Sequence, residues 1–278
     1  MKKEDIRIAI LRIEGTNCEQ ESFDAFNRLG SQPEFVHLKQ FLHIDCSKEE
    51  TRNLSEFQCL MIPGGFSSGD YIRAGAIFAA RMKSKLLKNL SHFVKEGYPI
   101  LGICNGFQVL IELGLLPGMK SLISSIPESC LHINDSNRFE CRPTFLKHEN
   151  YGNCIATNKL SHGSIQMIPS AHAEGKLILS NTKQKKILDE LKENDQIVFR
   201  YVNPQGNYEG YPWNPNGSYD NIAGICNREG NVFGMMPHPE RVFYRYQHPD
   251  WTKTKMDDNV GDGRVIFDSI LSYVEKKF

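Results

Sequence analysis

Along the first 113 residues of the chain, short apolar runs alternate with segments whose apolar residues recur at helical spacing. A short apolar run bounded by turn signals is typical of a buried strand, and apolar positions three and four apart indicate one face of a helix. We therefore predict strands at 6–11, 34–38, 58–62 and 99–103, and helices at 19–29, 73–96 and 105–113. This alternation favours an α/β fold, with a mostly parallel open sheet and helices on both faces.

The second half of the chain changes character, because strand patterns follow one another with short turns between them. We predict strands near 139–146, 163–168, 176–180, 196–202, 222–226 and 231–236, a helix near 185–193 and a closing amphipathic helix over 262–277. Strands so close in sequence favour hairpins, so we expect added antiparallel strands beside the parallel core. Segments 118–138 and 203–221 are predicted loops, and the aromatic residues of the second also suit a cover over a site. We expect one domain over 1–278.

Composition and charge narrow the class of protein. Hydrophobic residues make up 40% and charged residues 24%, which is typical of a globular chain. Basic and acidic residues number 33 each, so bulk charge does not favour nucleic acid or an anionic membrane as a partner. No apolar run approaches the roughly 18 residues that span a membrane, and the N-terminus lacks a signal-peptide pattern. We expect a cytoplasmic protein with reduced thiols, and no metal site, because no cysteines have C-x-x-C spacing.

The strongest chemical signal is the segment Gly-Ile-Cys-Asn-Gly, 102–106, where an apolar strand gives way to a helix. This pattern is typical of a nucleophile elbow, a sharp turn whose neighbours must lack side chains. The dipole of the following helix favours the thiolate, which is the reactive form of cysteine. A buried core cysteine is the ordinary alternative for a free thiol. The two flanking glycines favour Cys104 as a nucleophile.

A cysteine nucleophile needs a general base, and His238 is the strongest candidate among nine histidines. It lies in the segment Met-Pro-His-Pro-Glu-Arg, 236–241, at the end of a predicted strand. The flanking prolines predict an extended segment and exclude a helix. Residues two apart in an extended segment point the same way, so Glu240 can orient the imidazole. A surface turn with an ordinary histidine is the alternative for this segment taken alone.

The third feature is the segment Ile-Pro-Gly-Gly-Phe, 62–66, at the end of another predicted strand. Its glycines allow a ligand close to the backbone, and an N–H group there could form an oxyanion hole with that of Asn105. A plain strand-end turn is the alternative. Because carboxyl ends of parallel strands meet at one sheet edge, we expect residues 62, 103 and 236 to lie close together. The chain has no P-loop, G-x-G-x-x-G or H-E-x-x-H motif, so nucleotide chemistry is expected on another chain.

Five segments together resemble a known family: PGGFSSGDYIRAGAI (63–77), GICNGFQVLIELGLLPG (102–118), RFECRP (138–143), PSAHAEGK (169–176) and GMMPHPER (234–241). They are similar to the glutaminase subunits of phosphoribosylformylglycinamidine synthase, which are class I, or triad-type, glutamine amidotransferases. The resemblance covers about residues 6–243 and the last helix, and it implies a flavodoxin-like fold.

The resemblance also implies a role for each matching residue. It implies Cys104 as nucleophile, His238 as base and Glu240 as the partner of that base. It implies an oxyanion hole formed by Gly65 and Asn105. It further implies contacts to the substrate glutamine from Gly64, Phe66, Gln108, His172 and Glu174. Gln108 follows Cys104 by four residues on the same predicted helix, so the spacing itself also indicates that both face one side.

The implied activity is hydrolysis of glutamine to glutamate and ammonia. The ammonia would supply a large synthetase subunit that converts formylglycinamide ribonucleotide to formylglycinamidine ribonucleotide in purine biosynthesis. ATP and magnesium are expected on that subunit, no cofactor on this chain, and a small accessory subunit in the complex. A glutaminase serving a different ATP-dependent synthetase is the main alternative. The intact triad argues against a non-catalytic module, and Gln108 argues against a cysteine hydrolase. The chain differs from the compact bacterial members of this family in segments 118–138, 203–221 and 244–261. The resemblance therefore implies no particular surface for contact with the partner.

Overall fold

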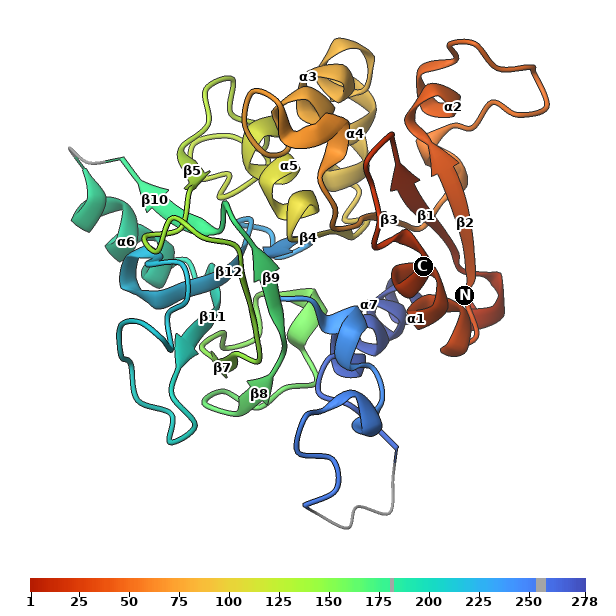
Figure 1. Ribbon diagram of the computed structural model, residues 1–278. Coiled ribbons are helices and arrows are strands. Elements are labelled where there is room, and N and C mark those ends of the chain that lie inside the picture. Colours follow the sequence, from red (N-terminus) through yellow and green to blue (C-terminus); the bar gives the residue numbers. More distant parts are fainter. Residues whose placement is uncertain (181–182, 254–258) are drawn as a thin grey trace.

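The computed structural model describes residues 1–180, 183–253 and 259–278. Its main feature is a nine-stranded sheet with helices packed against it (Figure 1). The strand order is β2 (Gln32–His37), β1 (Arg7–Arg12), β3 (Cys59–Ile62), β4 (Ile100–Ile103), β13 (Val232–Met235), β12 (Ile222–Cys226), β11 (Ile197–Val202), β7 (Phe145–His148) and β8 (Ile165–Met167). The predicted α/β class is confirmed.

The two halves of the sheet differ in strand direction. The pairs β1–β2, β1–β3, β3–β4 and β4–β13 are parallel. The pairs β13–β12, β12–β11, β11–β7 and β7–β8 are antiparallel. The prediction of antiparallel strands beside a parallel core is therefore confirmed. Strand β13 joins the parallel half although it comes from the far end of the chain, so its carboxyl end reaches the same edge as those of β3 and β4.

The helices are α1 (Glu19–Arg28), α2 (Leu38–Leu42), α3 (Ala76–Lys85), α4 (Leu87–Lys95), α5 (Asn105–Leu113), α6 (Gln184–Glu193) and α7 (Arg264–Lys277). Helix α5 contacts β3, β4, β13 and α3, and α3 contacts α4, so these three helices form one layer. Helices α1 and α7 contact each other on the other side of the parallel strands (Figure 1). Strands β3, β4 and β13 are buried along their whole length between the layers.

Two predicted elements are each divided in the structure. The predicted helix 73–96 is two helices that meet at Leu86, and this turn lets α4 bury Leu90, Phe93 and Val94. The predicted strand 139–146 is β6 (Glu140–Arg142) followed by β7. Pro143 separates them, because proline has no N–H group to donate to a sheet. Helix α2 was not predicted.

Two small antiparallel sheets lie beside the main one. One pairs β5 (Ser129–His132) with β10 (Lys176–Leu179), so the prediction of a loop over 118–138 is wrong at residues 129–132. The other pairs β6 with β9 (Ser170–His172), a strand that was not predicted. Such short strands depend on a partner distant in sequence, and local pattern alone identifies them poorly. Residues 203–221, all of them described, contain one 3-10 turn, Tyr219–Asn221, as expected of a loop.

One connected set of buried apolar side chains extends from Ile6 to Val274. All eight cysteines are free thiols. Within the described ranges, no helix is long and apolar enough to cross a membrane. The segment 244–261, in which the sequence differs from compact bacterial members of the family that it resembles, includes residues 254–258, which lie outside the described residues.

Candidate active site

Cys104 occupies a strained turn between β4 and α5. Its backbone has φ 52° and ψ −106°, a conformation that costs a non-glycine residue about 1–3 kcal/mol. A Cβ atom on Gly102 would lie 2.6 Å from the carbonyl oxygen of Gly106, and one on Gly106 would lie 1.9 Å from that of Ile62. The predicted elbow is confirmed as a backbone conformation, and both glycines are required by close contact.

We expect the substitution Gly106→Ala to destabilise the protein by about 1–3 kcal/mol or more, since the methyl group overlaps backbone that cannot rotate away. The measurement is the urea midpoint of unfolding. Gly210→Ala is the matched control, because Gly210 has no atom within 4 Å of its would-be Cβ. An equal midpoint for both variants would contradict the requirement for glycine at 106.

His238 and Glu240 come together just beyond β13. His238 Nδ1 lies 2.6 Å from Glu240 Oε1, and both side chains are buried. The predicted pairing is thus present, but the predicted extended backbone is wrong, because Pro239–Val242 forms a 3-10 turn. Pro239 is its first residue, a position where the missing N–H group and the fixed φ of proline suit a helix.

The charge state of His238 follows from competing effects. Burial lowers the pKa of His238, but the carboxylate of Glu240 and the thiols of Cys104 and Cys18 oppose burial and hold this pKa well above its usual value. His238 Nε2 is buried and has no protein partner among the described residues. This nitrogen is therefore free to exchange a proton with a group that enters the site.

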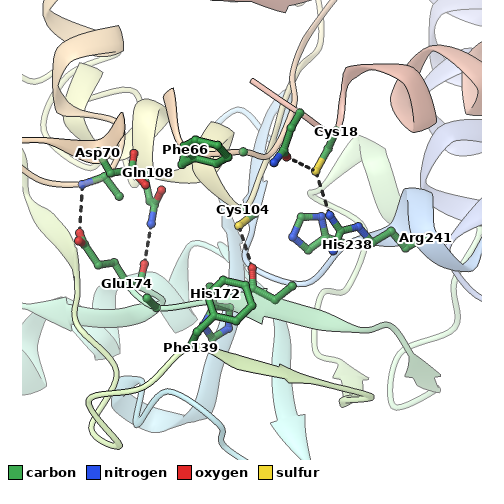
Figure 2. A pocket seen from close by; sticks show the side chains of 15 residues that line it. Cys18, Phe66, Asp70, Cys104, Gln108, Phe139, His172, Glu174, His238 and Arg241 are labelled. Carbon is green, nitrogen blue, oxygen red and sulfur yellow. Dashed lines mark hydrogen bonds between the residues drawn. The ribbon is translucent and has the colours of Figure 1, made fainter. Parts of the chain in front are cut away.

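A cavity of about 440 Å³ opens above these residues (Figure 2). Seven of the predicted site residues line it: Gly65, Phe66, Cys104, Gln108, His172, Glu174 and His238. The other three support the lining: Glu240 bonds to His238, Asn105 donates to Gln108 Oε1, and a Cβ on Gly64 would lie 3.3 Å from Cys104 Cβ. The carboxyl ends of β3, β4 and β13 thus converge on one site, as predicted.

Gly65 and Asn105 flank Cys104 from two elements. The segment that contains Gly65 is fixed against the loop after β1, since Phe66 N donates to Gly15 O and Asn17 N donates to Gly64 O. A Cβ on Gly65, whose φ is +145°, would lie 2.7 Å from Gly15 O. Asn105 is the first residue of α5, so its N–H group belongs to the unpaired first turn of a helix.

One end of the cavity is acidic. Gln108 Nε2 donates to the backbone oxygen of Glu174 at 2.6 Å, and Ala74 N donates to the Glu174 carboxylate at 3.0 Å. Asp70 accepts from Asn105 Nδ2 at 3.1 Å. Burial, with a further contribution from Glu174, raises the pKa of Asp70 to about 6. Two carboxyl groups therefore face the cavity on the side of Cys104 away from His238, as Figure 2 shows.

His172 lies at the end of β9, where Glu140 of β6 is its sheet partner. Burial, together with the charge of His238, lowers the pKa of His172 to about 4. The adjacent residue Ala171 contacts Cys104 through its carbonyl oxygen, which lies 3.6 Å from Cys104 Sγ. A neutral His172 at physiological pH thus forms part of the wall rather than a second base.

The structure adds lining residues that the sequence analysis missed. They are Asn17, Cys18, Asp70, Ala74, Phe139, Ala171, Ala173 and Arg241. Arg241 Nη2 donates to Cys18 Sγ at 3.1 Å although 223 positions separate the two residues. Asp70 and Arg241 lie inside the motifs already singled out, which was a usable signal. Cys18 lies three residues after Gly15 in the loop that follows β1, outside every motif singled out from the sequence.

Known proteins resemble this chain over nearly its whole length. Residues 5–274 match the family model described as the CobB/CobQ-like glutamine amidotransferase domain. A relative from Archaeoglobus fulgidus, named phosphoribosylformylglycinamidine synthase subunit PurQ, is 54% identical over 278 residues, covering 99% of this chain and 100% of its own. A relative of the same name from Picrophilus torridus is 46% identical, with 94% and 96% covered.

A solved structure, that of PurLQS from Thermotoga maritima, extends the comparison to three dimensions. It contains a chain with a TM-score of 0.69 and 31% identity, and the match covers 97% of this chain and 99% of that one. The family model and both relatives span nearly the whole length of the sequence. This chain therefore belongs to the glutamine amidotransferase family whose members form the PurQ subunit of phosphoribosylformylglycinamidine synthase.

Proposed function

We propose that this chain hydrolyses glutamine to glutamate and ammonia through Cys104, His238 and Glu240. The observation that carries the proposal is the convergence of a strained elbow cysteine and a carboxylate-bound histidine on one cavity. The family supports the activity, and the residues match the order nucleophile, base and orienting carboxylate. The main alternative, a glutaminase that serves another ATP-dependent synthetase, uses the same chemistry and differs only in its partner.

In the proposed mechanism, the thiolate of Cys104 attacks the carboxamide carbon of glutamine. The backbone N–H groups of Gly65 and Asn105 stabilise the oxyanion that forms. His238 donates a proton from Nε2 to the departing nitrogen, ammonia leaves, and a thioester remains on Cys104. His238 then takes a proton from water, the water oxygen attacks the thioester carbon, and glutamate is released. Glu240 holds the imidazole in position through Nδ1 during both steps.

The acidic end of the cavity suits the α-ammonium group of glutamine. Asp70 and Glu174 both line it, and their neighbours fix them: Asn105 bonds to Asp70, and Ala74 bonds to Glu174. Gln108 links the two groups, because it bonds to Asn105 and to the backbone of Glu174. A substrate bound here would direct its carboxamide toward Cys104 in the centre of the cavity. This orientation is part of the proposal.

We expect Asp70→Asn to raise KM for glutamine about 10- to 100-fold, the effect of losing one hydrogen bond to a charged group. Because the pKa of Asp70 is about 6, its carboxyl group is ionised above pH 6 and neutral below it. The KM of the unmodified protein should therefore rise as pH falls through 6, and that of the variant should stay flat. Steady-state kinetics against pH measure both, with Asp189→Asn on α6 as the exposed control.

Although Asp70→Asn is expected to weaken glutamine binding, we expect it to stabilise the folded protein. The pKa of Asp70 rises from its usual 3.8 to about 6 on folding, so the folded state disfavours the ionised form. Asp70→Asn should then melt at a higher temperature than the unmodified protein above pH 6, with the difference lost as pH falls toward 4. A variant less stable at every pH would indicate a structural defect and would remove the KM result as support.

We further propose that a synthetase subunit docks around the mouth of the cavity. Side chains of Phe66 and Phe139 line the cavity and are 54% and 64% exposed, and the adjacent Tyr71 and Ile72 are 83% and 77% exposed. Exposed apolar groups gathered at one place are typical of a protein interface. The similar chain from Thermotoga maritima belongs to a structure named PurLQS, and this name supports a complex with two further subunits. In this proposal ATP and magnesium bind to the synthetase subunit.

The test measures glutamate release by this chain alone and with the large and small subunits of the Archaeoglobus fulgidus enzyme. We expect weak release alone and a strong rise when the partners, ATP and formylglycinamide ribonucleotide are present. A parallel assay detects formylglycinamidine ribonucleotide, whose formation requires transfer of the ammonia. Release that never responds to these partners would contradict the assignment to this synthetase while leaving the glutaminase chemistry standing.

A further inference from the structure

Three side chains converge on the bare backbone of Gly64. A Cβ atom built there would lie 2.8 Å from His238 Cε1, 3.2 Å from Cys18 Sγ and 3.3 Å from Cys104 Cβ. A backbone hydrogen bond fixes Cys18 beside Gly64, because Cys18 N donates to Gly64 O at 3.2 Å. The candidate active site therefore contains a second thiol, one for which the proposed glutaminase reaction has no use.

Two buried side-chain atoms at this point have no hydrogen-bond partner among the described residues. His238 Nε2 is buried and has no partner among the described residues, whereas Nδ1 is bound by Glu240. Cys18 Sγ, a ring nitrogen of His238 and a carboxylate oxygen of Glu240 all lie within 4.8 Å of one another. One carboxylate oxygen, Glu240 Oε2, is also buried without a described partner. Sulfur and imidazole nitrogen are the ligands that Zn²⁺ prefers in proteins.

We propose that Cys18 and His238 Nε2 bind a thiophilic divalent cation such as Zn²⁺, with Cys104 as a further ligand in the unmodified chain, and that this binding inhibits the enzyme. The Glu240–His238 bond has the form of the carboxylate contact that orients zinc-binding histidines. Arg241 Nη2 donates to Cys18 Sγ at 3.1 Å, so the ion takes the place of this hydrogen bond when it binds to the sulfur. The cavity beside Cys18 and His238 gives the ion its path from solvent.

Inhibition follows from the atoms involved, and this part rests on the proposed function. A cation on His238 Nε2 displaces the proton of this nitrogen to solvent, and it then occupies the imidazole that would transfer protons to ammonia and from water. The same cation also screens Cys104 from the carboxamide of glutamine. A chelator should restore activity fully, since no covalent bond is formed or broken.

The binding site can be tested without any activity. Co²⁺ replaces Zn²⁺ in such sites, and a thiolate ligand gives it a charge-transfer absorption in the near ultraviolet. In the variant Cys104→Ala, Cys18 is the only thiol among the residues that line the cavity. We expect this variant to bind one Co²⁺ with that absorption, and the double variant Cys104→Ala/Cys18→Ala to lose it. Cys104→Ala/Cys141→Ala is the matched control, because Cys141 is exposed and should leave the spectrum unchanged.

The same absorption in the Cys104→Ala/Cys18→Ala variant would overturn the site, whatever the enzyme assay shows. Far-ultraviolet circular dichroism verifies that each variant is folded. A further variant, His238→Ala in the Cys104→Ala background, should weaken Co²⁺ binding about tenfold or more, as loss of a metal contact does. Unchanged affinity in that variant would equally overturn the proposal.

Measurements of glutaminase activity in the presence of Zn²⁺ test whether metal binding at this site inhibits the enzyme. Zn²⁺ should inhibit glutamate release by the unmodified chain, and Cys18→Ala should need about ten times more Zn²⁺ for the same fractional loss. Each variant is compared with its own metal-free activity. Equal sensitivity of both proteins would overturn the inhibitory role, and failure of the glutaminase proposal would appear separately as no activity before metal is added.

Discussion

The substitution Cys104→Ala is expected to lower glutamate release about 10⁶-fold, the order of the loss seen when a triad nucleophile is removed. The physical reason is that no other group can form the thioester on which the proposed mechanism depends. The fold should survive, because alanine tolerates the backbone of this turn as well as cysteine does. The sulfur makes one weak hydrogen bond, to Ala171 O at 3.6 Å, which the variant loses. Steady-state release of glutamate measures the effect.

Two further measurements make this result specific. Isothermal titration should show that Cys104→Ala still binds glutamine, since the acidic end of the cavity is unchanged. A glutamine analogue that alkylates thiols should add one equivalent to Cys104, and mass spectrometry of peptides identifies the position. Cys141→Ala is the control and should retain full activity. Substantial hydrolysis by Cys104→Ala, or labelling of Cys18 in place of Cys104, would sink the assignment of the nucleophile.

The second large effect is expected from Glu240→Gln, which keeps the shape of the side chain and removes its charge. We expect kcat to fall about 10²- to 10⁴-fold, as when the orienting carboxylate of a triad is neutralised. Burial lowers the pKa of His238, and the Glu240 carboxylate is the leading effect that raises it, so the variant should have a lower His238 pKa. His238 then loses its proton at a lower pH than in the unmodified protein. The alkaline limb of the plot of activity against pH should therefore move to lower pH.

A matched control exists on the surface. His92 and Glu96 form an exposed pair on α4, with 3.7 Å between Nδ1 and Oε1. Glu96→Gln removes the same charge beside a histidine and should leave kcat and its pH profile unchanged. If Glu240→Gln lowered kcat without any change in the profile, Glu240 would act through structure rather than through the charge of His238.

Much of the site could be predicted because its requirements are local. The elbow needs glycine at positions 102 and 106, since the sharp turn brings backbone within 2.6 Å of any Cβ there. The alternation of strands and helices follows from the spacing of apolar residues, which depends only on neighbours in the chain. His238 and Glu240 are only two residues apart, so their side chains can meet in more than one backbone conformation. The predicted contact is therefore present even though the predicted extended backbone is wrong.

Other features depended on which distant segments meet. The strand β13 enters the sheet beside β4, and this pairing alone brings His238 to Cys104. The partner residues of β9 are 28 to 32 positions away and those of β5 are 44 to 50 positions away, so the short patterns of these strands carried little local information. The break at Leu86 likewise depends on packing of α4 rather than on any glycine or proline in the sequence.

The sequence by itself determined the fold class, the elbow around Cys104 and the pairing of His238 with Glu240, because each depends on residues within a few positions of one another. Only the tertiary structure decided that Cys18, Arg241 and Asp70 line the same cavity. Cys18 and Arg241 meet across 223 positions of chain. Such contacts are set by how the strands order in the sheet and not by spacing along the sequence.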